Sequence, residues 1–314
     1  MPARWNCSIV IPVYHAELSL EALVSHLGDV LPEICDRYEV ILVNDGSLDK
    51  SWEVITILAN NYPWVRGINL MRNYGQHNAI LCGLRSASHE IIVTMDDDLQ
   101  HPPDQIHKIL EKLDEGYDVV YGFPEYEQHG LWRNLASQLT KLALQNTMGA
   151  ETARRVSAFR ALRTIICQSF SGYQSTYINI DVLLTWGTER FAAIPVHHDR
   201  RLAGESHYTV RKLMLHAINM ITGFSVLPLQ IASWMGFAFA IFGGLVLLYV
   251  LGRYLIQGGS VPGFPFLAST IAIFSGVQLF ALGIIGEYLA RMHFRLMDRP
   301  PYVIRDEMNK EEAN

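Results

Sequence analysis

Two long stretches without a charged residue constrain the fold of this chain more than any other feature. They span Leu229–Leu251 and Phe264–Ile285, and a helix of either length can cross a hydrocarbon core of about 30 Å. The segment between them contains GGSVPGFP, a tight turn without lysine or arginine. A buried helical hairpin of a soluble protein is the alternative, although two such stretches in succession are rare in soluble cores. We therefore predict a two-helix transmembrane hairpin over residues 227–290.

Basic residues flank the outer ends of this predicted hairpin. Arg211 and Lys212 precede the first span, and three arginines follow the second between positions 291 and 299. Under the positive-inside rule both ends lie in the cytoplasm, together with the domain before the spans. Arg253, at the loop end of the first span, weakly opposes this orientation. Residues 291–314 then form a cytoplasmic tail, whose end, RDEMNKEEAN, is typical of a disordered or an interaction-making segment.

Residues 209–226, directly before the first span, have apolar side chains at helical spacing and cations on the other side. This pattern is typical of a helix that lies in the membrane interface with its cations near lipid headgroups. A helix packed on a soluble domain explains the pattern nearly as well, and the position beside a span favours the interface. The apolar residues are Val210, Leu213, Met214, Ala217, Ile218, Ile221 and Phe224.

The first 125 residues alternate between apolar, β-branched runs and amphipathic stretches. This order predicts an α/β domain, a Rossmann-like, mostly parallel sheet with helices on both faces. Ligands of such sheets bind beyond the carboxyl ends of the strands. Polar motifs follow four predicted strands: PVYHAE, NDGS, RNYGQH and MDDDLQHPP. Neither a Gly-x-Gly-x-x-Gly fingerprint nor a P-loop is present, which argues against a dinucleotide cofactor.

The triple acid in MDDDLQHPP is the strongest single candidate for chemistry. The alternating geometry of a strand puts Asp96 and Asp98 on the same side, while Asp97 faces away. Carboxylates crowded in this way usually hold a cation, and oxygen ligands with open water positions suit Mg²⁺ or Mn²⁺ against a phosphate. A solvated acidic turn that caps the helix near Asp104 is the alternative.

Charge and cysteine usage exclude other classes of protein. The net charge is −6, and the basic residues of the front half form no stripe, so no nucleic-acid partner is expected. The four cysteines form no Cys-x-x-Cys pair and are typical of buried thiols.

The motifs in combination resemble the polyprenyl-phosphate glycosyltransferases of glycosyltransferase family 2, which include bactoprenol glucosyltransferases, undecaprenyl-phosphate aminoarabinose transferases and, more distantly, dolichyl-phosphate mannose synthases. The resemblance covers nearly the whole chain, from IVIPVY and VNDGSLDKS to IPVHHDRRLAGESHY and GEYLARM. It implies a GT-A domain over residues 1–208 and inverting transfer of a sugar from a UDP-sugar to a polyprenyl (undecaprenyl-type) phosphate. It also implies a bacterial inner membrane location and a homo-oligomer.

The resemblance assigns roles to individual residues. Asp96 and Asp98 would hold the metal and the diphosphate, with Asp97 beside them, and Asp45 would accept a hydrogen bond from the uracil N–H. Arg201, Ser206 and Tyr208, before the membrane, would bind the acceptor phosphate, and Arg201 would also assist catalysis; an arginine fork suits phosphate oxygens. The remaining nucleotide-binding residues would be Pro12, Tyr14, Arg72, Gly75 and Gln76. Asp45 as a mere turn residue and Arg72 as a surface cation are the alternatives.

The chain departs from its relatives at three places. Ala16 stands where they commonly have a glutamate, unless Glu17 replaces it, and His207 stands in place of a lysine. Ala158 stands where many have a catalytic aspartate, and Asp181 or Asp199 could assist instead. A phosphate monoester with a second pKa near 6 is, however, already an anionic nucleophile at neutral pH and needs no general base.

Two other functions are compatible with parts of the sequence. A processive polysaccharide synthase would share fold and donor, but the Gln-x-x-Arg-Trp motif of such enzymes is missing. A non-catalytic, membrane-anchored nucleotide-sugar-binding protein would explain the altered positions 16, 158 and 207, whereas the retained acids favour an enzyme.

Overall fold

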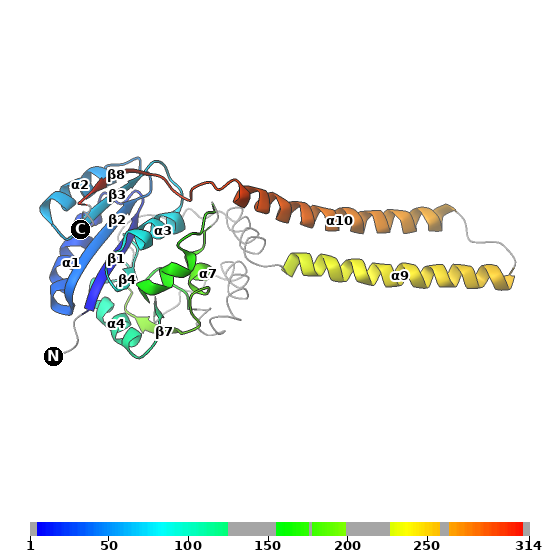
Figure 1. Ribbon diagram of the computed structural model, residues 1–314, viewed down its shortest axis with the longest axis horizontal. Helices are drawn as coiled ribbons and strands as arrows, with labels where there is room; N and C mark the ends of the chain where they lie inside the picture. Colours follow the sequence, from blue (N-terminus) through cyan, green and yellow to red (C-terminus); the bar gives the residue numbers. More distant parts are fainter. Residues whose placement is uncertain (1–4, 125–154, 176–177, 199–226, 258–263, 310–314) are drawn as a thin grey trace. The chain divides into compact units, whose positions relative to one another are not determined.

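The structure is a computed structural model of the 314-residue chain, and it describes residues 5–124, 155–175, 178–198, 227–257 and 264–309 (Figure 1). The chain divides into two compact units. The first comprises Met1–Leu213 together with Arg299–Asn314, and the second comprises Met214–Asp298. The predicted interfacial segment 209–226 lies outside the described residues.

The first unit is built on one sheet, which in the described residues has the strand order β7-β5-β6-β4-β1-β2-β3-β8. The four central strands β4, β1, β2 and β3 are parallel, as are β5 and β7, while β6 and β8 run antiparallel to their neighbours. The sheet is therefore mostly parallel, as predicted. The strands are β1 (Trp5–Val13), β2 (Cys35–Asn44), β3 (Val65–Leu70), β4 (Ile91–Thr94), β5 (Val119–Pro124), β6 (Arg160–Arg163), β7 (Phe191–Val196) and β8 (Ile304–Met308).

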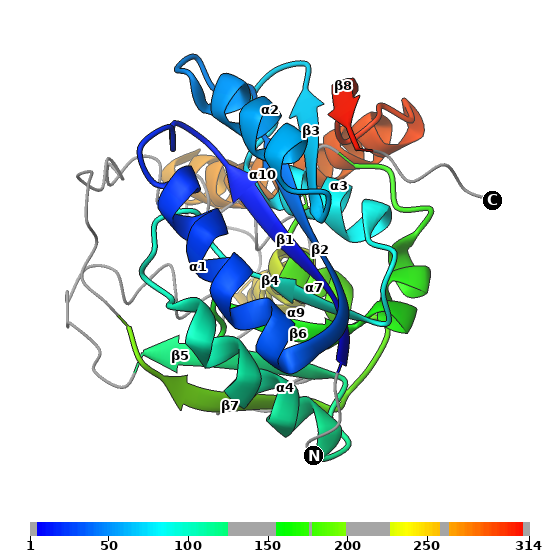
Figure 2. The same ribbon diagram turned by 90° about the vertical axis from the view of Figure 1, so that its left-hand side faces the viewer.

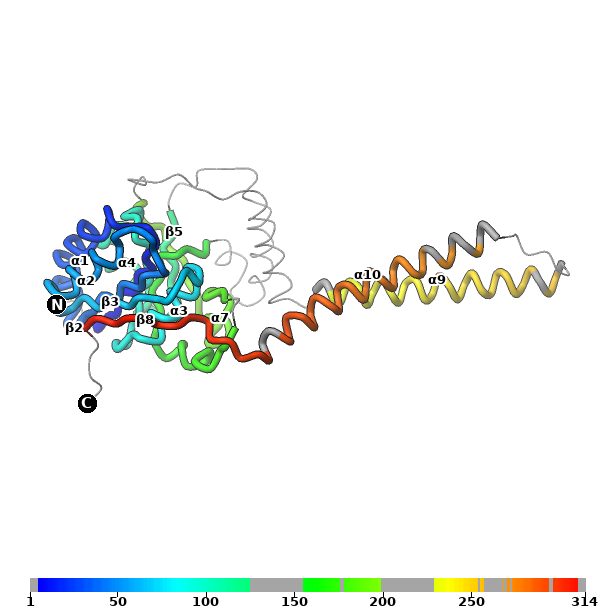
Figure 3. The backbone as a smooth tube through the Cα atoms, turned by 90° about the horizontal axis from the view of Figure 1, so that it is seen from above, coloured from blue at the N-terminus to red at the C-terminus, as the bar shows by residue number. Residues whose placement is uncertain are grey.

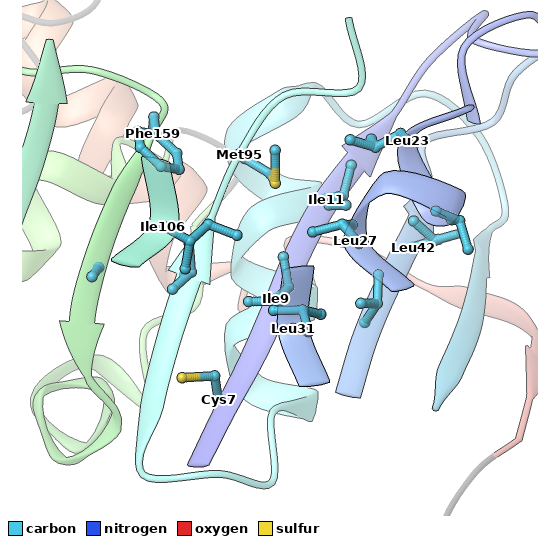
Figure 4. Packing of buried hydrophobic residues seen from close by; sticks show 14 of the residues in the cluster. Cys7, Ile9, Ile11, Leu23, Leu27, Leu31, Leu42, Met95, Ile106 and Phe159 are labelled. Atoms are coloured by element: carbon cyan, nitrogen blue, oxygen red, sulfur yellow. The ribbon is translucent and has the colours of Figure 1, made fainter. Parts of the chain in front are cut away.

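Helices cover both faces of this sheet (Figure 2). On one face α1 (Leu20–Ile34), α2 (Ser51–Asn61) and α4 (Ile106–Asp114) bury their apolar stripes against β1 and its neighbours. Figure 4 shows Ile9 and Ile11 of β1 among these side chains. On the other face lie α3 (Gln76–Ser86) and the short α7 (Ile180–Leu184).

The approach of α3 to the sheet depends on a glycine. A Cβ atom on Gly83 would lie 2.2 Å from Cγ1 of Val10 in β1.

Burial of the sheet on both faces explains why the central strands are continuously apolar rather than alternating. Two 3₁₀ helices, Pro103–Gln105 and Thr164–Phe170, complete the described elements of this unit.

The second unit contains two long helices, α9 (Leu227–Gln257) and α10 (Phe264–Leu296). Their segments Leu229–Arg253 and Ile273–His293 have mean hydropathies of 2.2 and 1.6, and neither is buried within the structure. Both helices are therefore long and apolar enough to cross a membrane. They pack on each other: the rings of Phe239 and Phe274 lie 6.0 Å apart, and Gly243 leaves room for Phe274.

The C-terminal segment returns to the sheet of the first unit. β8 pairs with β3 in antiparallel register, with Gly67 opposite Met308 and Leu70 opposite Ile304 (Figure 3, red tube beside β3). Of the two alternatives left open for the tail that begins at Arg305, the disordered one is therefore wrong for residues 305–308, which belong to β8, while residues 310–314 lie outside the described residues. Because the chain leaves this unit before α9 and rejoins it after α10, both ends of the hairpin connect to one folded domain.

Candidate active site

The polar motifs meet at one edge of the sheet, as the sequence predicts. β1, β2 and β3 end in neighbouring register, with Val13 opposite Asn44 and Asn44 opposite Asn69. β4, on the other side of β1, ends at Thr94, which pairs with Val10. The loops after these four strands therefore converge at the carboxyl edge of the parallel strands, the usual place for ligands.

Asp45, the first residue after β2, ties two of these loops together. Its side chain is buried, and its two oxygens accept hydrogen bonds from the backbone N–H groups of Tyr74 and Gly75 at 2.7 and 2.8 Å. Burial raises the pKa of the Asp45 carboxyl, and the two amide hydrogen bonds oppose that rise. Each carboxylate oxygen can accept a second hydrogen bond, so the carboxylate can hold the loop and bind a ligand donor together.

The turn at Gly46, after β2, packs directly on the loop after β3, which comprises residues 72–75. Gly46 has a φ of +64°, and a Cβ atom there would lie 2.4 Å from the carbonyl carbon of Arg72. Gly75, at the other end of the loop, has a φ of +96°. Between them the Arg72 guanidinium lies 4.7 Å from the centre of the Tyr74 ring. The backbone of 72–75 is thus held on the turn after β2, with the Arg72 side chain exposed.

Gly46→Ala is expected to destabilise the protein by about 1–3 kcal/mol more than Gly116→Ala, because its Cβ meets backbone that cannot move aside. Gly116 is the matched control: its φ is +104°, but a Cβ atom there would meet nothing within 4 Å. Thermal unfolding of the two purified variants measures the difference. Equal melting temperatures would show that the turn and the loop are not tightly packed.

The three acids lie in a turn rather than in a strand. β4 ends at Thr94, so the alternation expected to place Asp96 and Asp98 together does not extend to them. The Asp97 carboxylate lies against the loop after β1, where it accepts a hydrogen bond from the Tyr14 N–H at 3.2 Å. Asp96 accepts from the Gln76 amide at 2.7 Å, and Asp98 from the Gln100 N–H at 3.2 Å.

The acid turn is anchored in the core by the residue that precedes it. Met95 is buried in the same cluster as Ile11 and Phe159 (Figure 4). Leu99 then takes a φ of +59°, which bends the chain back after Asp98. The three carboxylates are consequently held near one another at the sheet edge.

The crowding of the three carboxylates affects the pKa of the middle one, Asp97. Burial, and then the charges of Asp96 and Asp98, raise the pKa of the Asp97 carboxyl to about 7. A divalent cation would relieve this repulsion, so the donor set fits Mg²⁺ or Mn²⁺. Over the described ranges no three His, Cys, Asp or Glu side chains converge as metal ligands. The described residues alone therefore offer few ligands, as is usual where phosphate oxygens and water complete the shell.

Comparison with known proteins assigns this arrangement to a family. A model described as "Glycosyl transferase family 2" matches residues 8–177. The chain belongs to this family. Its fold is the GT-A fold that the resemblance implied. The family predicted from the sequence motifs is therefore confirmed.

Two groups of relatives illustrate the membership. Undecaprenyl-phosphate 4-deoxy-4-formamido-L-arabinose transferase of Pseudomonas aeruginosa (strain LESB58) is 34% identical over 300 residues, which are 95% of this chain and 88% of the relative. The protein of the same name from Yersinia pestis (strain Pestoides F) is 33% identical over 309 residues, covering 98% and 94%.

A solved structure shares the fold. Glucosyl-3-phosphoglycerate synthase from Mycobacterium tuberculosis, in complex with Mn²⁺, uridine diphosphate and glucosyl-3-phosphoglycerate, superposes with a TM-score of 0.52 and 17% identity. The match covers 69% of this chain and 78% of the synthase chain. At this identity the likeness shows the fold.

At Ala16, where the resemblance implies a glutamate, the structure shows what the neighbouring Glu17 does. The Glu17 carboxylate accepts a hydrogen bond from the Lys50 N–H at 2.9 Å, and the Ala16 N–H donates to the Ser51 hydroxyl at 2.9 Å. Lys50 is the N-cap residue of α2. Glu17 thus joins the first loop to the start of α2, without occupying position 16.

Ala158, where the resemblance implies an aspartate, lies beside the start of the acid turn. The Thr94 hydroxyl donates to the Ala158 carbonyl at 2.6 Å and accepts from Nε of Arg160 at 3.0 Å. Arg160 in turn forms a buried ion pair with Asp181, whose carboxylate also accepts a hydrogen bond from the Tyr121 hydroxyl at 3.0 Å. Asp181 is committed to this buried network and does not face the site as a free acid.

One further side chain near the acid turn, His101, escaped sequence reasoning. His101 is buried, and within the described residues neither of its ring nitrogens has a hydrogen-bond partner. Its ring stacks on Phe159 at 5.2 Å and meets His198 edge-on at 4.8 Å. Burial lowers the pKa of His101 to about 4, so its ring stays neutral. No periodicity in QHPP distinguishes such a histidine from a solvated one.

The remaining predicted residues divide into two sets. Tyr14 lies half-exposed beside His15 at the edge of the site, whereas Pro12 is buried within β1. Arg201, Ser206 and Tyr208 lie outside the described residues, as do His207 and Asp199. Their roles stay predictions.

Proposed function

We propose that the chain transfers a sugar from a UDP-sugar to a polyprenyl phosphate of the undecaprenyl type at the membrane surface. The observation that carries this proposal is the match of 95% of the chain, at 34% identity, to relatives named undecaprenyl-phosphate sugar transferases. Two features of the structure support it. A crowded acid turn lies beside the loop that Asp45 holds, and two helices have the length and hydropathy of membrane spans.

The donor would bind along the carboxyl edge of the sheet. Asp45 and the 72–75 loop would hold the base, with Tyr14 beside it, and Gln76 and Asp97 would lie near the diphosphate. Asp96 and Asp98 would hold Mg²⁺ or Mn²⁺, which supplies charge stabilisation to the departing diphosphate. The M. tuberculosis synthase of the same fold has been seen with Mn²⁺ and uridine diphosphate.

The chemical step would need little from the protein beyond binding and alignment. An oxygen of the lipid phosphate attacks the anomeric carbon, the bond from that carbon to the diphosphate oxygen breaks, and UDP leaves with the electron pair. The lipid phosphate is already anionic at neutral pH, so Ala158 removes no indispensable base. Arg201, Ser206 and Tyr208 would hold the acceptor phosphate, and holding both substrates at the membrane aligns them.

The connectivity of the chain supports a membrane topology with the sheet domain on one side. If α9 and α10 both cross, the chain returns to the side it left, which pairing of β8 with β3 requires. The basic residues outside the spans favour the cytoplasmic side, and the protein would then be an inner-membrane enzyme. A homo-oligomer remains part of this proposal only by resemblance to the family.

The proposed function is tested by UDP release from the detergent-purified, full-length protein. Undecaprenyl phosphate and a panel of UDP-sugars, beginning with UDP-4-deoxy-4-formamido-L-arabinose, are supplied with Mg²⁺ or Mn²⁺. We expect release that requires the lipid and stops when a chelator is added. Binding of UDP without release from any sugar would favour a non-catalytic nucleotide-sugar-binding protein instead.

A further inference from the structure

The C-terminal strand lies directly beside the loop proposed to bind the nucleotide. β8 pairs with β3 up to Leu70, and the Met71 N–H then donates to the Val303 carbonyl at 2.9 Å. Arg72 follows at once, so the loop begins where its contact with the C-terminal segment ends. The position of this loop thus depends on a strand that follows both long helices in the chain.

Side chains continue this connection across three strands. Nδ2 of Asn69 in β3 donates to Oδ2 of Asp306 in β8 at 3.1 Å. Nδ2 of Asn44 in β2 donates to Oδ1 of Asn69 at 2.8 Å. Both asparagines are buried, whereas the Asp306 side chain is 52% exposed. These hydrogen bonds form a chain, called the ladder below, that runs from Asn44 through Asn69 to the Asp306 carboxylate.

The inner end of this ladder lies next to the site. Asn44 is the last residue of β2 and immediately precedes Asp45. Its Oδ1 accepts from the Ser47 N–H at 3.4 Å, a long contact that spans the turn at Gly46. A fixed Asn44 side chain therefore constrains the turn that carries Asp45, whose oxygens in turn hold Tyr74 and Gly75.

We propose that Asp306 is a positioning residue for the nucleotide: it orients Asn69 and Asn44, and through them the Asp45 turn and the 72–75 loop. This inference rests on the proposed function, because it takes uridine diphosphate as the ligand of that loop. Loss of the Asp306 acceptor removes the partner that fixes the orientation of the buried Asn69 amide.

The neighbouring residue of the same strand provides a matched control. Glu307 pairs with Arg66 at 3.3 Å, and Arg66 continues to Glu39 at 2.7 Å and to the Ser86 carbonyl. These contacts anchor β8 on β3 just as Asp306 does, but they lead to Glu39 in β2 and to the end of α3 rather than to the site. Glu307→Gln therefore weakens the attachment of β8 to β3 while leaving the hydrogen bonds from Asp306 to Asn69 and Asn44 in place.

The experiment measures UDP affinity of the full-length, detergent-purified protein in Mn²⁺ by titration calorimetry, together with steady-state kinetics. Asp306→Ala is expected to weaken UDP binding roughly fivefold, the effect of one hydrogen bond, and to raise the donor KM equally. Because only binding is affected, kcat should stay within about twofold and the lipid KM should not change. Asp306→Asn keeps an acceptor oxygen and should restore wild-type affinity, and Glu307→Gln should match wild type.

Three results would overturn the inference: UDP affinity of Asp306→Ala within about twofold of wild type, equal loss in Glu307→Gln, or no rescue by Asp306→Asn. A lower melting temperature of Asp306→Ala with unchanged UDP affinity would likewise reduce Asp306 to an anchor of the strand. If the wild-type protein itself binds no UDP, the proposed function fails, and this inference fails with it.

Discussion

Replacing Asp98 with alanine is expected to lower kcat for UDP release by at least about a hundredfold, the usual cost of losing electrostatic stabilisation of a leaving group. Asp98 lies in the acid turn, and in the proposed reaction it holds the cation that stabilises the diphosphate as it departs. In the described residues no group of three His, Cys, Asp or Glu side chains converges as metal ligands. Loss of Asp98 would therefore leave Asp96 as the single proposed protein ligand in the acid turn.

The Asp98 variant should keep its fold, which separates this result from misfolding. Removal of one of three crowded carboxylates relieves the repulsion that raises the pKa of Asp97. The melting temperature should therefore not fall in the absence of metal, and the gain in stability that Mn²⁺ gives the wild type should be lost. Asp104→Ala is the matched control, since this acid follows on the same segment but is exposed. Turnover of Asp98→Ala within a few-fold of wild type would exclude the proposed catalytic role of this acid.

Replacing Asp181 with alanine is expected to destabilise the sheet domain by about 3–5 kcal/mol, because it leaves a buried guanidinium without its counter-ion. The Arg160 side chain is only 2% exposed, so water cannot replace the lost carboxylate. The same change removes the hydrogen-bond acceptor of the Tyr121 hydroxyl. Denaturant or thermal unfolding of the purified variant measures the loss.

A surface ion pair and a double variant serve as controls for this prediction. Glu111→Ala removes a partner of His107 from an exposed pair and should change stability by less than about 0.5 kcal/mol. Replacing both Arg160 and Asp181 with apolar residues of similar volume should recover much of the loss, since no buried charge is then left alone. A double variant less stable than Asp181→Ala would contradict this account of the network.

The sequence predicted the part of the site that depends on strand order. Apolar β-branched runs that alternate with helices imply parallel strands, and parallel strands bring their carboxyl ends to one edge. Asp45, Arg72 and the three acids follow such strands directly, so they could be placed together without any knowledge of contacts. The two long apolar helices were equally readable, because their length and lack of charge are local properties.

Contacts between distant segments could not be predicted in the same way. The acid turn was expected to alternate as a strand, yet β4 stops at Thr94, and no local pattern marks that end. The pairing of β8 with β3 joins Leu70 to Ile304 across both long helices, and the sequence IRDEM lacks the apolar alternation of a half-buried strand. Its charged residues instead meet Asn69 and Arg66, partners that only the folded sheet brings near.

In the proposed reaction the lipid phosphate itself receives the sugar, so the mass of the lipid after the reaction distinguishes this transfer from hydrolysis. Undecaprenyl phosphate is extracted after incubation with the full-length protein, Mn²⁺ and the UDP-sugar that gives most UDP release, and its mass is measured. We expect a metal-dependent gain of one sugar residue that is absent from the Asp98→Ala variant. UDP release with an unchanged lipid mass would exclude the lipid as the acceptor, because the sugar would then have passed to water or to another molecule.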